Sequence, residues 1–112
     1  MTEADIYAIL SPVVLPDKVF PYVAPQSNPA ITAPWCVFSL YDVKGDVLKG
    51  QAETMTNIQV DVYADTIDEA RTLRLLFANS LTKLSPVEIS EKQGYEPDTG
   101  LFRATFECQV WQ

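Results

Sequence analysis

The spacing of apolar residues changes near residue 65, where a predicted strand runs into the longest predicted helix of the chain. In residues 57–64 apolar and polar side chains alternate, as in a strand with one buried face; Ile58, Val60 and Val62 alternate with Gln59, Asp61 and Tyr63. From residue 67 the apolar positions follow helical spacing, at Ile67, Ala70, Leu73, Phe77, Leu81 and Leu84.

The ends of this helix are also marked in the sequence. Thr66 is placed to accept hydrogen bonds from the first free amides, and Glu69 follows three residues later, which is the spacing of a capping box. Pro86 cannot continue the helix, so we expect it to end by Leu84. Arg71 and Arg74 lie mostly off the apolar stripe and are predicted on the polar face.

The remaining elements are shorter. Residues 2–10 predict a helix that opens with a weak capping box, and Pro21 marks residues 18–23 as a short edge strand. Residues 34–41 form a strand that is apolar on both faces, which predicts cover on both sides, by helices and loops or by another subunit. Residues 87–91 and 101–111 alternate as strands, and residues 93–100 read as a turn-rich loop.

A connection of fifteen residues, 42–56, separates two confidently predicted strands. This length is unusual for a hairpin, and long connections are often functional. We expect it to project from the sheet as an arm or loop.

The element order is therefore α–β–β–β–α–β–β. Hairpin-linked strands favour an antiparallel or mixed sheet of four to five strands, with both helices on one face. The predicted fold class is α+β, a two-layer sandwich, and the 112 residues fit a single domain spanning 1–112.

Composition narrows the class of protein. At 47% hydrophobic residues the chain can build a core, yet it contains no apolar run of membrane-spanning length, so we expect a soluble protein. The N-terminus lacks the pattern of a secretory signal. With only two cysteines, Cys36 and Cys108, we expect a reducing cytoplasmic environment.

The net charge of −7 disfavours sequence-independent binding to nucleic acid, which needs lysine and arginine to replace counterions. A negative charge of this size is expected for a protein that binds a basic protein partner, or for one that must not adhere to DNA. It could also serve only to keep the protein soluble.

Signals for catalysis are weak. The chain has no histidine and no glycine-rich phosphate loop, and both cysteines fall on strand faces expected to be buried. Four carboxylates could act as acid and base or hold a divalent ion, namely Asp61, Asp65, Glu96 and Asp98. A simpler explanation is that Asp61 is a solvated strand residue, Asp65 a helix cap and Asp98 a turn former. We therefore expect no enzyme, no metal and no cofactor.

Aromatic residues give a stronger signal. Four of them lie on the strand faces opposite the predicted core, where they would mark a contact surface; these are Trp35, Tyr41, Tyr63 and Trp111. The alternative is that the proline-rich segment 13–34 folds over them.

Four stretches together resemble the tail completion proteins of long-tailed bacteriophages and prophages, which act as tail terminators or tail-to-head joining subunits. The stretches are VFPYVAPQ (19–26), PWCVFSLYDV (34–43), IQVDVYADTIDEARTLRLLF (58–77) and GYEPDTGLFRATFECQVW (94–111). The most specific parts, 59–71 and 94–104, are not catalytic motifs. The resemblance covers nearly the whole chain and leaves the terminator and joining roles both open.

The resemblance implies a structural virion protein. Such subunits form a hexameric ring that caps the tail tube, stops its polymerisation and presents a surface to the head connector, while DNA passes through without specific binding. They are made in the host cytoplasm and end in the virion tail. On this basis the subunit-interface candidates are Trp35, Tyr41, Tyr63, Arg71, Arg74 and Trp111. The candidates for contact with the lumen or the tube are Lys44, Asp46, Val47, Leu48, Lys49 and Glu53.

Two other functions are compatible with the sequence. One is a dimeric cytosolic module that binds a small ligand in a pocket lined by Trp35 and Tyr41. The other is a hydrolase that uses Asp61, Asp65 or the pair Glu96 and Asp98.

Overall fold

The computed structural model describes residues 1–13, 16–25, 31–44 and 54–111. Within them, five strands form one sheet in the order β1-β2-β3-β5-β4. The strands are β1 (Val19–Pro21), β2 (Trp35–Lys44), β3 (Thr54–Ala64), β4 (Val87–Glu96) and β5 (Leu101–Trp111). Strand β1 pairs with β2 in parallel and the other neighbours are antiparallel. The predicted α+β class, mixed sheet and element order are confirmed.

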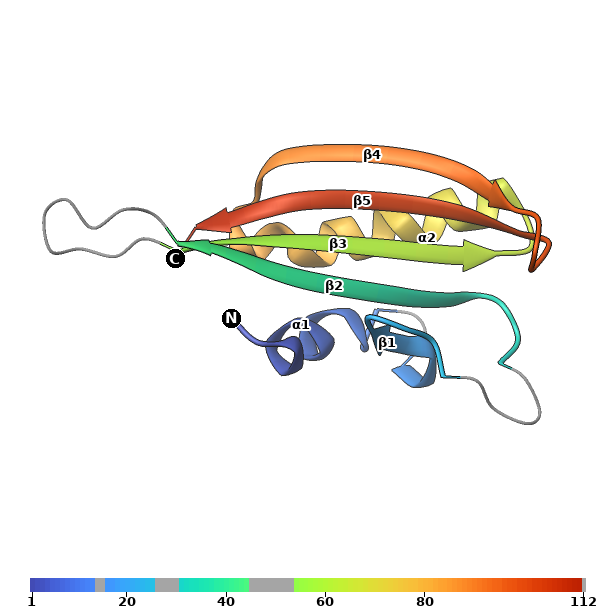
Figure 1. Ribbon diagram of the computed structural model, residues 1–112, viewed down its shortest axis with the longest axis horizontal. Helices are drawn as coiled ribbons and strands as arrows, with labels where there is room; N and C mark the ends of the chain where they lie inside the picture. The colour runs from blue at the N-terminus through green and yellow to red at the C-terminus, as the bar shows by residue number, and fades with distance from the viewer. Residues whose placement is uncertain (14–15, 26–30, 45–53, 112) are drawn as a thin grey trace, which may run out of the picture.

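Two helices, α1 (Glu3–Leu10) and α2 (Ile67–Ser80), cover the same face of this sheet. Figure 1 shows α2 lying behind β3 and β5, with α1 beside β1 at the other end of the strand order. The core between the layers is built from alternate residues of the strands and the apolar stripes of the helices; it includes Ile6, Leu10, Cys36, Phe38, Ile58, Val60, Val62, Phe77, Phe106 and Cys108. The predicted placement of both helices on one face is confirmed.

Helix α2 begins as the sequence indicates and ends one turn earlier. The Thr66 side chain accepts a hydrogen bond from the Glu69 amide at 3.1 Å, which satisfies one free donor of the first turn. The α-helix stops at Ser80 and continues as a 3₁₀ turn, η2 (Leu81–Leu84). Ser85 then adopts a left-handed backbone conformation with φ of 53°, which turns the chain into β4.

The N-terminal helix α1 is hydrogen-bonded to Tyr22, the residue that follows β1. Thr2 and Asp5 form the predicted capping box at the start of α1. The Tyr22 hydroxyl donates a 2.7 Å hydrogen bond to the Glu3 carboxylate. This bond lowers the pKa of Glu3 and raises the pKa of Tyr22, because it stabilises the carboxylate and the protonated phenol.

The end of β4 differs from the prediction. Strand β4 continues through Glu96, so residues 93–96 are strand and the loop that was predicted to start at Gln93 is a turn of residues 97–100. Strand β5 pairs with them along its first four residues, which supplies backbone partners that local turn composition does not reveal.

The predicted long connection is also shorter than expected. Residues 42–44 pair with residues 54–56 and extend β2 and β3 into the connection. Residues 45–53 lie outside the described part of the chain, and so does the prediction that they project as an arm. Among the described residues, no helix combines the length and apolar character needed to cross a membrane.

Candidate functional site

The face of the sheet opposite the helices has no second layer within the described residues, and its side chains form rows across β2, β3 and β5. One row near the start of β2 joins Trp35, Tyr63 and Arg103. Side chains on this face repeat every second residue along each strand. The rows in the middle of the sheet are mostly polar, and the row at its far end is apolar, with Val43, Met55 and Trp111. We call this surface the open face.

Trp35 and Tyr63 lie on the open face as cross-strand neighbours. Their rings stack with centroids 5.6 Å apart and planes at 29°. Both side chains are half-buried. Burial raises the pKa of the Tyr63 phenol, the charge of Asp61 adds to this effect, and Arg103 opposes it. Tyr63 is therefore a neutral hydrogen-bonding group at physiological pH.

A second apolar group lies at the other end of the open face. It consists of Tyr41, Val43, Met55 and Trp111, and we call it the end cluster. Tyr41 and Trp111 are 58% and 55% exposed, whereas Met55 lies between Val43 and Trp111 on adjacent strands and is buried. Tyr41 is six residues from Trp35 along β2, which corresponds to about 20 Å. The four predicted aromatic residues thus form two separate groups.

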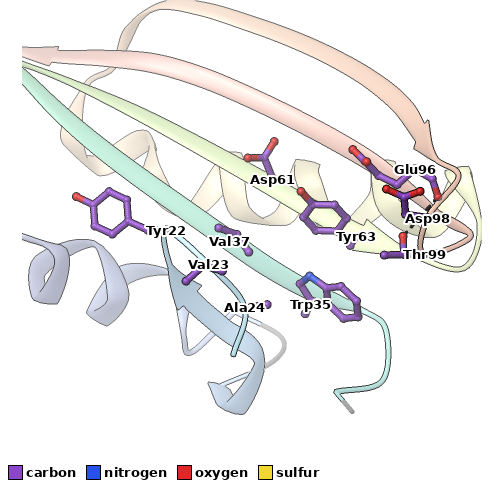
Figure 2. A pocket seen from close by; sticks show the side chains of 10 residues that line it. All are labelled: Tyr22, Val23, Ala24, Trp35, Val37, Asp61, Tyr63, Glu96, Asp98 and Thr99. Carbon is purple, nitrogen blue, oxygen red and sulfur yellow. Dashed lines mark hydrogen bonds between the residues drawn. The ribbon is translucent and has the colours of Figure 1, made fainter. Parts of the chain in front are cut away.

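A groove of about 370 Å³ crosses the open face at the Trp35 end. Figure 2 shows its side chains, which come from the segment after β1, from β2 and β3, and from the end of β4 and the turn that follows it. The lining residues are Tyr22, Val23, Ala24, Trp35, Val37, Asp61, Tyr63, Glu96, Asp98 and Thr99. The groove therefore combines an apolar and aromatic wall with three carboxylates.

The three groove carboxylates have different partners. The Asp61 carboxylate accepts hydrogen bonds from the Gln59 side-chain amide at 2.9 Å and from the Thr105 hydroxyl. Glu96 forms a 3.0 Å ion pair with Arg103. Within the described part of the chain, the exposed Asp98 carboxylate has neither a hydrogen-bond donor nor a cation beside it. Asp98 is the groove carboxylate that is available to a ligand.

The fourth predicted carboxylate lies elsewhere. Asp65 is exposed immediately before the cap of α2 and does not line the groove. Among the described residues, no group of three histidine, cysteine, aspartate or glutamate side chains could hold a metal ion. The structure brings Asp61, Glu96 and Asp98 to one groove and leaves Asp65 outside it.

The prediction that Arg74 lies on the polar face of the helix is wrong. Arg74 is only 8% exposed, and its guanidinium reaches from α2 to the backbone of β4 and β5. It donates to the Lys92 carbonyl at 2.9 Å and the Gln93 side chain at 3.1 Å, and it pairs with Glu91 at 3.3 Å. Arg71 lies where expected and is exposed.

Both cysteines are fully buried on the helix side of the sheet. Burial raises the pKa of the Cys108 thiol to about 11 and that of Cys36 further. Because the thiolate is the nucleophilic form, neither cysteine is placed or poised for catalysis.

The predicted lumen or tube contacts are mostly beyond what the structure describes. Lys44 is exposed at the end of β2. The other candidates, Asp46, Val47, Leu48, Lys49 and Glu53, lie outside the described residues.

Several residues that line the groove were not among the predicted site residues. The segment 22–24 lines one side, so this described part of the proline-rich segment lies beside Trp35 and Val37, whereas Tyr41 and Trp111 are exposed. Thr99 and the turn around it line the other side. Glycine and proline in these segments indicate turns, but they do not indicate which surface a turn will face.

No protein-family model matches the chain, and no curated protein sequence matches it. Among solved structures, the chain is similar to a chain in the structure described as "Virion of native gene transfer agent (GTA) particle". The TM-score is 0.66 at 14% sequence identity, and the match covers 96% of this chain and 92% of that chain. The two chains therefore share a fold over nearly their whole length.

Proposed function

We propose that the protein is a structural, non-enzymatic virion protein that assembles as a ring on the end of a phage tail tube. There it terminates tail polymerisation and joins the tail to the head. The observation that carries this proposal is the fold shared with a chain of a gene transfer agent virion along 96% of the sequence. The resemblance of residues 59–71 and 94–104 to tail completion proteins supports the same role.

The open face supports assembly. It has no second layer within the described residues, and it carries the half-buried Trp35–Tyr63 stack at one end and the end cluster at the other. The exposed aromatic side chains of the end cluster, Tyr41 and Trp111, are typical of protein interfaces. A ring subunit also needs two different contact surfaces, because its contacts are head-to-tail.

The charge supports a channel through which DNA passes without binding. Six copies would carry 6 × −7 = −42 formal charges. Such an assembly repels the phosphate backbone, whereas a DNA-binding ring would need a basic lining.

The partners follow from this role. They are further copies of the chain in a hexameric ring, the tail tube protein and the head connector. Assembly takes place in the host cytoplasm and the product resides in the virion tail. Lys44, at the end of β2, and residues 46–49 and 53 are the proposed contacts with the lumen or the tube.

Tail length is the experiment that tests this function. The gene is deleted from the phage or prophage that encodes it, and the wild-type chain is supplied from a plasmid. The proposal expects overlong or headless tails after deletion and uniform tails with heads after complementation, measured in negative-stain images. Normal tails and infectious particles in the deletion strain would contradict it.

The groove favours one alternative, a dimeric module that binds a small ligand. Its volume of about 370 Å³ lies in the range of ligand sites, and Trp35 lines it as predicted. Tyr41, the second predicted pocket residue, lies outside the lining. Thermal stabilisation by small metabolites, together with a dimer in solution, would favour this alternative.

A further inference from the structure

We propose that the groove on the open face of one copy receives the outer surface of α2 from the next copy. In this contact the Arg71 guanidinium enters among the groove carboxylates and Leu75 packs against the aromatic wall. The inference rests on the proposed ring and names the two surfaces that build it.

The groove has the chemistry of an arginine site. A guanidinium forms forked hydrogen bonds with carboxylates and stacks on aromatic rings. The groove offers both partners, because the Trp35–Tyr63 stack lies on the same surface as three carboxylates. Figure 2 shows Asp98 at the turn end of the groove, beyond Tyr63. Asp98 lacks a cation partner among the described residues, so a cation from outside completes it.

Helix α2 supplies the matching group. Arg71 and Leu75 are one helical turn apart, so they lie on the same side of the helix. Both are exposed, and Leu75 is 59% exposed. Arg74 and Arg103 already hold ion pairs within the chain, whereas Arg71 has none among the described residues.

The positions of the two surfaces fit a closed assembly. The groove lies on the open face, and the exposed side of α2 belongs to the opposite layer (Figure 1). A contact between opposite layers is head-to-tail, so an open array of copies keeps one unused groove at one end and one unused helix surface at the other until a ring closes. The helix contributes a cation and an apolar side chain, and the groove contributes carboxylates and an apolar wall, so the contact is complementary in charge and in polarity.

Charge reversal tests the contact. The variants are Arg71→Glu, Asp98→Lys and the double variant that carries both changes. Their oligomeric states are compared with the wild type by native mass spectrometry. Controls are Lys83→Glu and Asp65→Lys, which reverse exposed charges outside the proposed contact. Thermal unfolding of each variant checks that the fold is retained.

We expect the wild type and both controls to form the same oligomer, and each single reversal to weaken association by more than about tenfold, because like charges then meet in the contact. The double variant, and an equal mixture of the two single variants, should recover the oligomer. Single variants that assemble like the wild type, or a double variant that does not recover, would overturn the inference. So would a wild type that stays monomeric at millimolar concentration. Tail length after complementation with each variant tests the proposed function separately. If the single variants still give tails of normal length, the proposed function stands and only the proposed contact is refuted.

Discussion

Replacing Arg74 with alanine is expected to lower the free energy of unfolding by about 3 kcal/mol. The side chain is 8% exposed, and it connects α2 to β4 through its contacts with residues 91–93. Its two short hydrogen bonds, to the Lys92 carbonyl at 2.9 Å and the Gln93 side chain at 3.1 Å, involve a charged donor. Each such bond contributes about 1.5 kcal/mol at the lower end of the usual range, so two give about 3 kcal/mol.

Two further contacts of Arg74 change this figure little. The bond to the Thr105 carbonyl is 3.4 Å long and correspondingly weak. The ion pair with Glu91 adds less than about 1 kcal/mol, because the Glu91 side chain is 51% exposed and water screens the pair. The variant Glu91→Gln should therefore lose only this smaller amount.

The assay is urea unfolding followed by circular dichroism, at a protein concentration where the chain is monomeric. Arg71→Ala on the same helix is the matched control and should stay within about 0.5 kcal/mol of the wild type, since Arg71 is exposed. Arg74→Met retains an apolar stem of similar length and separates lost packing from lost hydrogen bonds. If Arg74→Ala and Arg71→Ala unfold at the same urea concentration with equal slopes, the interior role assigned to Arg74 is refuted.

Three other contacts make separate predictions. Replacing Thr105 with valine should cost about 1–2 kcal/mol in the same assay, because a buried hydroxyl that donates to Asp61 is lost; an unchanged urea midpoint would contradict this. In Tyr22→Phe, the amides of α1 should exchange faster than in the wild type at neutral pH. The hydrogen bond from Tyr22 lowers the pKa of Glu3. The bond therefore stabilises the protein at pH values above the ordinary pKa of a glutamate, and this stabilisation is lost as the pH falls through the lowered pKa of Glu3. The exchange difference should therefore vanish in acid, and a difference that persists there would argue against this bond. Cys108 should not react with a thiol reagent at pH 8 until the protein is unfolded, because burial raises its pKa to about 11; rapid labelling of the native chain would show that the strand is open.

The passage from β3 into α2 could be predicted from the sequence because local signals agree there. Alternation identified the buried face of β3, and Thr66 marked the helix start. The position of Arg74 was predicted wrongly from its residue type, although its spacing from Ala70 and Phe77 places it on the buried stripe. Helical period was the better guide, and the charge is accommodated because backbone carbonyls and Gln93 surround it.

The open face could be predicted only in part. Alternation showed that Trp35, Tyr41, Tyr63 and Trp111 share a face, but strand register decides which of them are neighbours. The observed register places Trp35 beside Tyr63 and sends Tyr41 and Trp111 to the other end. The groove also depends on two segments far apart in the sequence, 22–24 and the β4–β5 turn, which both line it. No local sequence pattern predicts that these two segments lie on the same surface.

Whether copies of the chain assemble on the open face is decided by the mass of the purified chain at high concentration, measured by native mass spectrometry with negative-stain images of the same sample. A hexamer of 12.5 kDa subunits has a mass of 6 × 12.5 = 75 kDa. We predict this mass and ring-shaped particles with a central hole. A species of 12.5 kDa at every concentration, or a dimer without rings, would contradict the claim that copies of the chain cover the open face.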